Sequence, residues 1–275
     1  MMRLYFSVDI EGIAGVVSRD NLQPGRFEYE SARDWMTQAV VTASEAAHAL
    51  GAEEIVVSDS HGNGQNIRYE RMPPYVQLVR SWPRPLGMMQ GIEVGTYDGV
   101  FLIGYHAGST NPRGTLSHTV SGEFFQDVRI DGIAMSEAML SAAIAGHYGV
   151  PVLLVAGDDV VVEESVAALG DIATACLKYS QGWISARNLS PAQADLALRN
   201  GVKDAIDRIG RAGPFAAAAP LTLEIRMRSR FMAEWLGYLD HVERVDAYTI
   251  RHQCADVTGV SRFLMFLTSA RKALE

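Results

Sequence analysis

Short runs of consecutive apolar residues recur along the first part of the chain, with polar segments between them. They are residues 4–8 (LYFSV), 55–58 (IVVS), 100–103 (VFLI) and 152–155 (VLLV). Each run is continuous rather than alternating, which is typical of a strand that is covered on both faces. We therefore expect four buried strands.

Helical patterns lie between these runs. From Ala32 to Leu50, apolar residues recur at steps of three and one, and Gly51 follows where a C-cap glycine belongs. A second apolar stripe runs from Met135 to His147, directly before the fourth run. Strands that alternate with helices predict an α/β fold, with a mostly parallel sheet sandwiched by helices.

The chain after about residue 170 has a different pattern. Residues 190–193 (SPAQ) form a capping box with proline at the first helical position, so a helix should begin there. Strands are expected at residues 221–225 and 244–250. A last helix should begin near Val260, with Arg271 and Lys272 in its final turn, where the helix dipole favours cations.

We interpret this part as a smaller C-terminal α+β lobe. The predicted division is an α/β domain at residues 1–170 and the lobe at residues 171–275, although a single domain is also compatible with the pattern. Residues 213–220 are the best candidate linker.

Composition excludes several classes of protein. The chain has 275 residues, 48% of them hydrophobic, and a net charge of -8, which argues against disorder and against a nucleic-acid partner. The two cysteines, Cys176 and Cys254, indicate neither a disulfide framework nor a cysteine-ligated zinc site. Neither a signal peptide nor a run of roughly 18 apolar residues is present, so we expect a cytoplasmic protein without a membrane partner.

Acidic residues and histidines follow the predicted strands. Asp9 and Glu11 follow the first, His61 the second and His106 the third, while Asp158 and Asp159 follow the fourth. The carboxyl ends of parallel strands line the ligand crevice of open α/β sheets, so these side chains should converge. An unpaired charge directly after a buried strand is costly, which favours Asp9 as a metal ligand.

Other residues have competing interpretations at this stage. His118 can be a ligand, a proton shuttle or a surface residue, and Glu137 can simply complement the dipole of the helix that it begins. Asp158 and Asp159 can orient ligand imidazoles or cap the next helix. Four histidines away from the predicted sheet edge are expected to be structural: His48, His147, His241 and His252.

Carboxylates and histidines without cysteine fit a hydrolytic metal site. Zinc accepts both ligand types, and a bridging aspartate permits two ions about 3.5–4 Å apart. Magnesium fits less well because it prefers oxygen ligands, whereas manganese, cobalt and iron remain alternatives. The sequence contains neither GxSxG nor GxxxxGK[ST], which argues against a serine hydrolase and a P-loop enzyme.

An ordered set of motifs resembles the D-aminopeptidase family of zinc peptidases, peptidase family M55. The resemblance spans about the first 195 residues, and the remainder matches in general layout only. The motifs are SVDIEG at 7–12, DSHG at 59–62 with Asn66, GYHA at 104–107, Gly114 to His118, Glu137, AGDD at 156–159 and LSP at 189–191.

The resemblance implies a dinuclear zinc site and an aminopeptidase. Asp9 would bridge both ions, Glu11 and His106 would bind one, and His61 and Glu137 the other. His118 would be the catalytic residue. Short peptides with an N-terminal D-residue such as D-alanine would be the substrates. The subunits would form a ring-like homo-oligomer, such as a decamer, with the active sites facing an internal chamber.

Two positions depart from the family pattern. Ser136 stands where glycine usually precedes the helical glutamate, and Trp183 stands where a basic residue is frequent, a change that can reshape the substrate pocket. Two other functions remain open. The chain could be a two-metal hydrolase of another amide or a phosphoester, or a non-catalytic binding module that contains metal.

Overall fold

A seven-stranded sheet, sheet A, forms the centre of the larger part of the computed structural model, which describes residues 1–274, with side chains for residues 1–270. Its order is β3-β2-β1-β4-β7-β8-β9, and all neighbours are parallel except β8 and β9. The strands are β1 (Met2–Val8), β2 (Ala52–Asp59), β3 (Val76–Val79), β4 (Gly99–Tyr105), β7 (Val152–Asp158), β8 (Ala173–Gly182) and β9 (Ser185–Asn188).

The four continuous apolar runs all lie in the middle of sheet A, in β1, β2, β4 and β7, as predicted. Successive side chains of a strand point to opposite faces, so both faces here must be apolar. In β1, Leu4 and Phe6 belong to the core on one side of the sheet, and Tyr5 belongs to the core on the other. This burial explains why the runs do not alternate.

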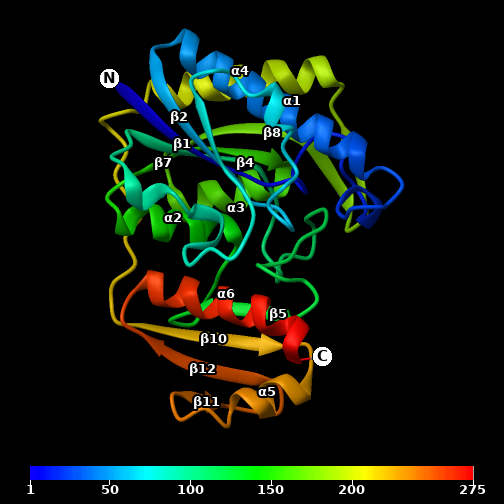
Figure 1. Ribbon diagram of the computed structural model, residues 1–275, viewed down its shortest axis with the longest axis vertical. Helices are drawn as coiled ribbons and strands as arrows, with labels where there is room; N and C mark the ends of the chain where they lie inside the picture. The colour runs from blue at the N-terminus through cyan, green and yellow to red at the C-terminus, as the bar shows by residue number, and fades with distance from the viewer. Residues whose placement is uncertain (275) are drawn as a thin grey trace.

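Helices cover both faces of sheet A (Figure 1). The helices α1 (Tyr29–Ala49) and α4 (Pro191–Ile206) pack on one face, and α2 (Glu137–His147) and α3 (Asp159–Leu169) on the other. The predicted capping box begins α4: Ser190 Oγ accepts from Gln193 N, and Gln193 Oε1 accepts from Ser190 N.

A five-stranded antiparallel sheet, sheet B, forms the smaller lobe below (Figure 1), in the order β11-β12-β10-β5-β6. Its elements are β5 (Phe125–Ile130), β6 (Ile133–Ala134), β10 (Leu221–Met227), α5 (Arg230–Leu236), β11 (Val242–Arg244), β12 (Thr249–Cys254) and α6 (Val257–Leu274). Helix α6 lies between sheet B and α2. A helix-covered, mostly parallel sheet with an α+β lobe is the predicted fold class, which is confirmed.

The boundary predicted at residue 170 does not separate the strands of sheet A from those of sheet B. After this position, β8, β9 and α4 still belong to the layer of sheet A, while β5 and β6, before it, belong to sheet B. The candidate linker, residues 213–220, connects α4 to β10. The division into two domains stays a prediction, but the lobe is not built from the C-terminal part alone.

The strand predicted at residues 244–250 is wrong. Strand β11 ends at Arg244, β12 begins at Thr249, and the chain reverses between them. The reversal depends on Asp246, whose Oδ1 accepts from the backbone nitrogens of Tyr248 and Thr249 at 2.7 and 2.8 Å. An aspartate that caps its own turn in this way ends a strand that the surrounding β-forming residues would otherwise continue.

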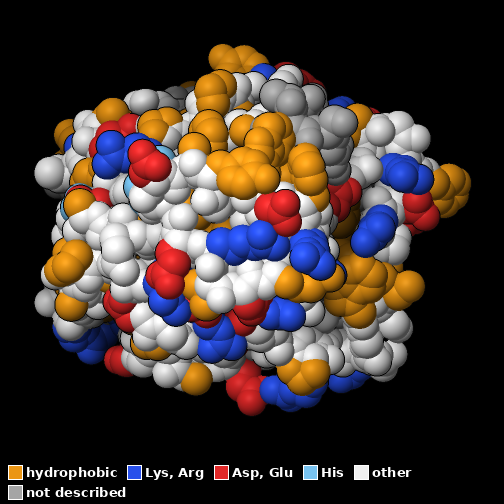
Figure 2. All heavy atoms as spheres, turned by 90° about the horizontal axis from the view of Figure 1, so that it is seen from below, with side chains coloured by type: hydrophobic (Ala, Val, Ile, Leu, Met, Phe, Trp, Pro, Cys, Tyr) orange, Lys and Arg blue, Asp and Glu red, His pale blue; other side chains and the backbone are white. Residues whose placement is uncertain are grey.

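Two further expectations concern membrane-spanning helices and the last turn of α6. None of the helices in the described part is both long and apolar enough to span a membrane, and the cytoplasmic location stays a prediction. The side chains of Arg271 and Lys272 lie outside the described residues. Figure 2 shows that hydrophobic side chains gather on part of the face that the smaller lobe presents.

Glycines allow the loops after β1 and β4 to touch through their backbones. Gly12 N donates to Gly104 O at 2.7 Å, and a Cβ on Gly12 would lie 2.0 Å from Tyr105 O. Gly104 has a φ of +74°, and its own Cβ would lie 2.1 Å from Asp9 O. These contacts bring the segment that begins at Asp9 directly against the end of β4.

We expect Gly12→Ala to lower the free energy of unfolding by about 2–3 kcal/mol, because the added methyl group overlaps a backbone oxygen that cannot move freely. Urea unfolding would measure the change. Gly213→Ala is the matched control, because no atom lies within 4 Å of its Cβ. Equal stability of the two variants would contradict this interpretation of the close approach.

Candidate metal centre

Five predicted ligands lie together at the carboxyl ends of β1, β2 and β4. Asp9 and Glu11 follow β1, His61 follows β2, His106 follows β4, and Glu137 is the first residue of α2. All five are buried. The convergence expected from the order of strands is present, and it places three carboxylates in a region from which solvent is largely excluded.

Asp9 lies between two histidine–carboxylate pairs. Its Oδ1 is 3.3 Å from His61 Nδ1, which is 3.0 Å from Glu11 Oε2. Its Oδ2 is 3.4 Å from His106 Nε2, which is 3.3 Å from Glu137 Oε2. Within each triplet, the candidate ligand atoms all lie within 4.8 Å of one another. One oxygen of Asp9 therefore faces each pair.

The closest contacts group the ligands differently from the family resemblance, but the candidate ligand atoms of Glu11, His106 and His118 also lie within 4.8 Å of one another. The resemblance pairs Glu11 with His106 and His61 with Glu137, whereas the carboxylates nearest the two imidazoles are Glu11 for His61 and Glu137 for His106. Which carboxylate lies nearest each imidazole depends on how the loops are placed in space, and the order of residues in the sequence does not reveal it.

Hydrogen bonds to backbone carbonyls orient both imidazoles. His61 Nε2 lies 2.8 Å from Leu22 O, and His106 Nδ1 lies 3.0 Å from Ala107 O. Because a carbonyl oxygen only accepts, each of these ring nitrogens carries the proton. In the neutral imidazole, the other nitrogen then presents a lone pair to the carboxylates, as in histidines that bind metals.

The donor set fits a cation. Glu11 Oε2 and His106 Nε2 are fully buried and have no hydrogen-bond partner within the described part of the chain. Buried polar atoms are normally satisfied, and leaving them unpaired costs free energy. Carboxylate oxygens and imidazole lone pairs that face one another repel, and a divalent cation between them would remove this cost.

The charges shift the pKa values of the cluster strongly. Burial acts to raise the pKa of Asp9, but the contacts with His106 and His61 outweigh it and hold that pKa well below its usual range. Burial acts to lower the pKa of both imidazoles, but Glu11 beside His61 and Glu137 beside His106 raise them well above the usual value. Without metal, protons would therefore compensate the carboxylates.

His118 occupies a different position in the same cluster. Its ring stacks on His106 with 4.2 Å between the centroids, and its Nε2 is 3.5 Å from Glu137 Oε1. Its Nδ1 lies 2.9 Å from Leu116 O and carries the proton, because a carbonyl only accepts. The side chain is 23% exposed, so it can reach both solvent and the cluster.

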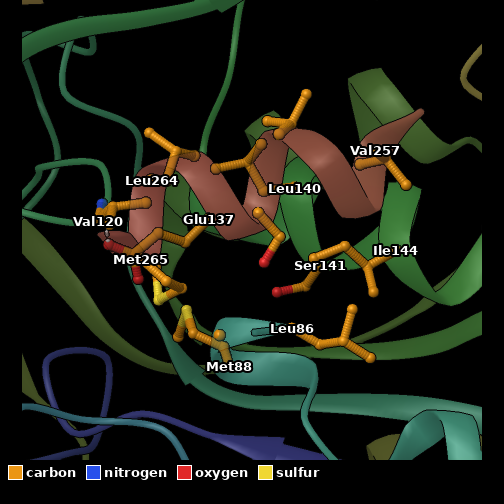
Figure 3. Close-up of a pocket in the computed structure, with 13 residues that line it drawn as sticks. Leu86, Met88, Val120, Glu137, Leu140, Ser141, Ile144, Val257, Leu264 and Met265 are labelled. Carbon is orange, nitrogen blue, oxygen red and sulfur yellow. Dashed lines mark hydrogen bonds between the residues drawn. The ribbon is translucent and has the colours of Figure 1, made fainter. Parts of the chain in front are cut away.

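Glu137 is held from two sides. Its Oε1 accepts from Val120 N at 2.7 Å. Its side chain also lines a cavity of about 30 Å³ between α2 and α6 (Figure 3), where Leu140, Leu264 and Met265 provide apolar walls. This cavity is too small for a peptide, so it is not a substrate pocket.

Asp158 caps a helix, which is one of the two roles that the sequence left open for it. Its Oδ1 caps α3 by accepting from Val161 N at 2.8 Å, and its Oδ2 accepts from Ser180 Oγ at 3.1 Å and from Thr115 N at 3.2 Å. Asp159 accepts from Ser180 N at 2.8 Å. These bonds fix the start of the segment that leads to His118.

Lys178 in β8 was not predicted from the sequence. Its fully buried ammonium donates to the carbonyl oxygens of Glu11, Ile13 and Val16, which curves the segment after β1 around it. Burial lowers the pKa of Lys178 to about 8, although nearby Asp158 opposes the shift. The available signal was one lysine within a mostly apolar stretch, ATACLKY at 173–179.

Comparison with known proteins identifies the family. The family model described as D-aminopeptidase, Peptidase_M55, matches residues 2–266. The chain belongs to this family. Membership confirms the predicted resemblance and the predicted class of enzyme, a metallopeptidase.

Two relatives of this D-aminopeptidase family member cover nearly all of it. A D-aminopeptidase from Bacillus subtilis (strain 168) is 29% identical over 268 residues, which are 97% of each chain. A solved structure, described as the Zn-dependent D-aminopeptidase DppA from Bacillus subtilis, a self-compartmentalizing protease, is 28% identical with a TM-score of 0.91. The match covers 98% of this chain and 97% of that one.

We expect Lys178→Met to lower the free energy of unfolding by about 3 kcal/mol, because three buried carbonyl oxygens lose their donor. Urea unfolding would measure it. Lys203→Met, at an exposed position on α4, is the control. If both variants unfold at the same urea concentration, the ammonium does not stabilise the segment after β1.

Proposed function

We propose that the chain is a zinc-dependent aminopeptidase that releases an N-terminal D-amino acid, such as D-alanine, from short peptides. The observation that carries the proposal is the position of Asp9 between two histidine–carboxylate pairs. It supports two ions per subunit, with Glu11 and His61 as further ligands of one, and His106 and Glu137 as further ligands of the other. Zinc suits this mixed nitrogen and oxygen set, and it is named for the similar Bacillus subtilis structure.

The ligand residues hold and insulate the centre. When bound, zinc would supply a Lewis acid for the scissile carbonyl and would lower the pKa of the attacking water. Hydrogen bonds from His61 to Leu22 and from His106 to Ala107 fix the direction of both ring lone pairs.

His118 is the proposed proton carrier. Its Nδ1–H is fixed on Leu116 O, so Nε2 is the basic nitrogen of the neutral ring and faces the cluster. This nitrogen takes a proton from the attacking water and returns it to the leaving amine, which is general base and then general acid catalysis. Its partial exposure lets the ring meet the substrate, whereas the five ligands are buried.

The proposed ring-like homo-oligomer rests on a different observation. The similar Bacillus subtilis structure is described as self-compartmentalizing. The smaller lobe of this chain also exposes large apolar side chains that a subunit interface would cover, among them Phe231, Trp235, Tyr238 and Phe266. Sedimentation analysis of the purified chain would give its subunit number.

The decisive experiment compares matched dipeptides after chelation. We expect release of D-alanine from D-Ala-D-Ala to disappear when the metal is removed and to return with added zinc, with much less release from L-Ala-L-Ala. Chromatography of the free amino acid measures it, and p-nitrophenyl phosphate controls for phosphoester hydrolysis. Cleavage of the phosphate alone, or of neither class, would overturn the proposal.

Single substitutions separate ligand from proton carrier. We expect Asp9→Ala to lose bound zinc, because this carboxylate contacts both halves of the centre. His118→Ala should keep the zinc while turnover falls about 10²–10⁴-fold, the usual contribution of a general acid–base group. Elemental analysis beside the peptide assay measures both effects.

His147→Ala is the control for these variants, since it removes an exposed histidine from the far end of α2. It should keep both zinc and turnover. Full activity of the His118 variant, or full zinc content of the Asp9 variant, would rule out the corresponding role.

A further inference from the structure

Arg19 and Trp183 lie against each other although they are far apart in the sequence. Arg19 begins a short 3-10 helix, Arg19–Asn21, and its guanidinium carbon lies 5.4 Å from the centre of the Trp183 ring. Trp183 is half exposed at the turn between β8 and β9. A cation over an aromatic face is attracted to it, so the ring restricts where the guanidinium can point.

Trp183 forms two hydrogen bonds with the segment that leads to His118. The indole Nε1 donates to Ser117 O at 3.4 Å, and the backbone oxygen of Trp183 accepts from Leu116 N at 2.7 Å. Leu116 O in turn accepts from His118 Nδ1. The indole therefore lies against the backbone segment that carries the proposed proton carrier.

Arg19 lies in the segment that orients His61, a proposed ligand in the other half of the centre. Leu22, three residues after Arg19, accepts the hydrogen bond of His61 through its carbonyl oxygen at 2.8 Å. The stack of Arg19 on Trp183 thus connects the segment that orients a proposed ligand with the segment that carries the proton carrier. The stack therefore lies where two segments that border the metal centre meet.

Arg19 is an exposed cation that makes no ion pair within residues 1–270. Several arginines of the chain form ion pairs, such as Arg68 with Glu30 and Arg113 with Glu163, whereas Arg19 contacts an aromatic ring. Stacking occupies the face of the guanidinium and leaves the N–H groups at its edge free. Those N–H groups match the two oxygens of a carboxylate.

We propose that Arg19, held on the Trp183 ring, binds the C-terminal carboxylate of the peptide whose N-terminal residue lies at the metal centre. This inference rests on the proposed function and deepens it. The C-terminal carboxylate of a peptide is an anion, and a guanidinium beside it compensates its charge and donates two hydrogen bonds. Selection of short peptides follows, because only a short chain has its C-terminal carboxylate near the scissile bond of its N-terminal residue.

The test compares D-Ala-D-Ala with its C-terminal amide, using the zinc-loaded full chain. For Arg19→Gln, kcat/KM should fall at least about ten-fold more for the free acid than for the amide, with most of the change in KM, because only the acid loses a charge-assisted hydrogen bond. Arg19→Lys should recover part of the loss. Trp183→Leu removes the stacking surface. It should lower kcat/KM less than Arg19→Gln does, again more for the free acid than for the amide.

Arg26→Gln is the matched control, an exposed arginine in the same segment. It should leave the ratio of the two substrates unchanged. Equal losses on acid and amide in Arg19→Gln, or no loss on either, would overturn the assignment of Arg19. A wild-type chain that cleaves neither substrate would instead contradict the proposed function, and the inference that rests on it.

Discussion

The structure depends on bringing three buried carboxylates to one edge of a parallel sheet. Asp9, Glu11 and Glu137 lie in a region where uncompensated charge is costly, and each has an imidazole nitrogen within 3.5 Å. The backbone around them serves this convergence: Gly12 permits contact between the loops after β1 and β4, and Lys178 gathers the carbonyl oxygens that follow Glu11. Remote residues thus determine the shape of the site.

Much of this edge could be predicted because it depends on local sequence. A buried central strand must be apolar on both faces, so its ends are visible in the sequence, and the polar residues directly after it are assigned to the crevice. This reasoning reached Asp9, Glu11, His61 and His106. It did not reach Glu137, because a first-turn glutamate also has an ordinary explanation in the helix dipole. Only the family resemblance favoured it.

Non-local pairing explains what could not be predicted. Strands β8 and β5 join sheets on the other side of the predicted division at residue 170, and no local pattern records which sheet a strand will enter. The partnership of Glu11 with His61 likewise depends on the relative positions of two loops, not on their order. Lys178 was missed because its partners are backbone oxygens more than 160 residues away in sequence.

The stacked imidazoles of His106 and His118 show how surroundings divide roles between identical side chains. Both donate from Nδ1 to a backbone carbonyl, so both present Nε2 to the cluster. His106 Nε2 lies between two carboxylates and is fully buried, which suits a fixed ligand. His118 Nε2 lies 3.5 Å from Glu137 Oε1, which already accepts a hydrogen bond from Val120 N, and its ring reaches solvent. A group that must accept and return protons needs this looser position, so the proposed roles follow from packing and not from residue type.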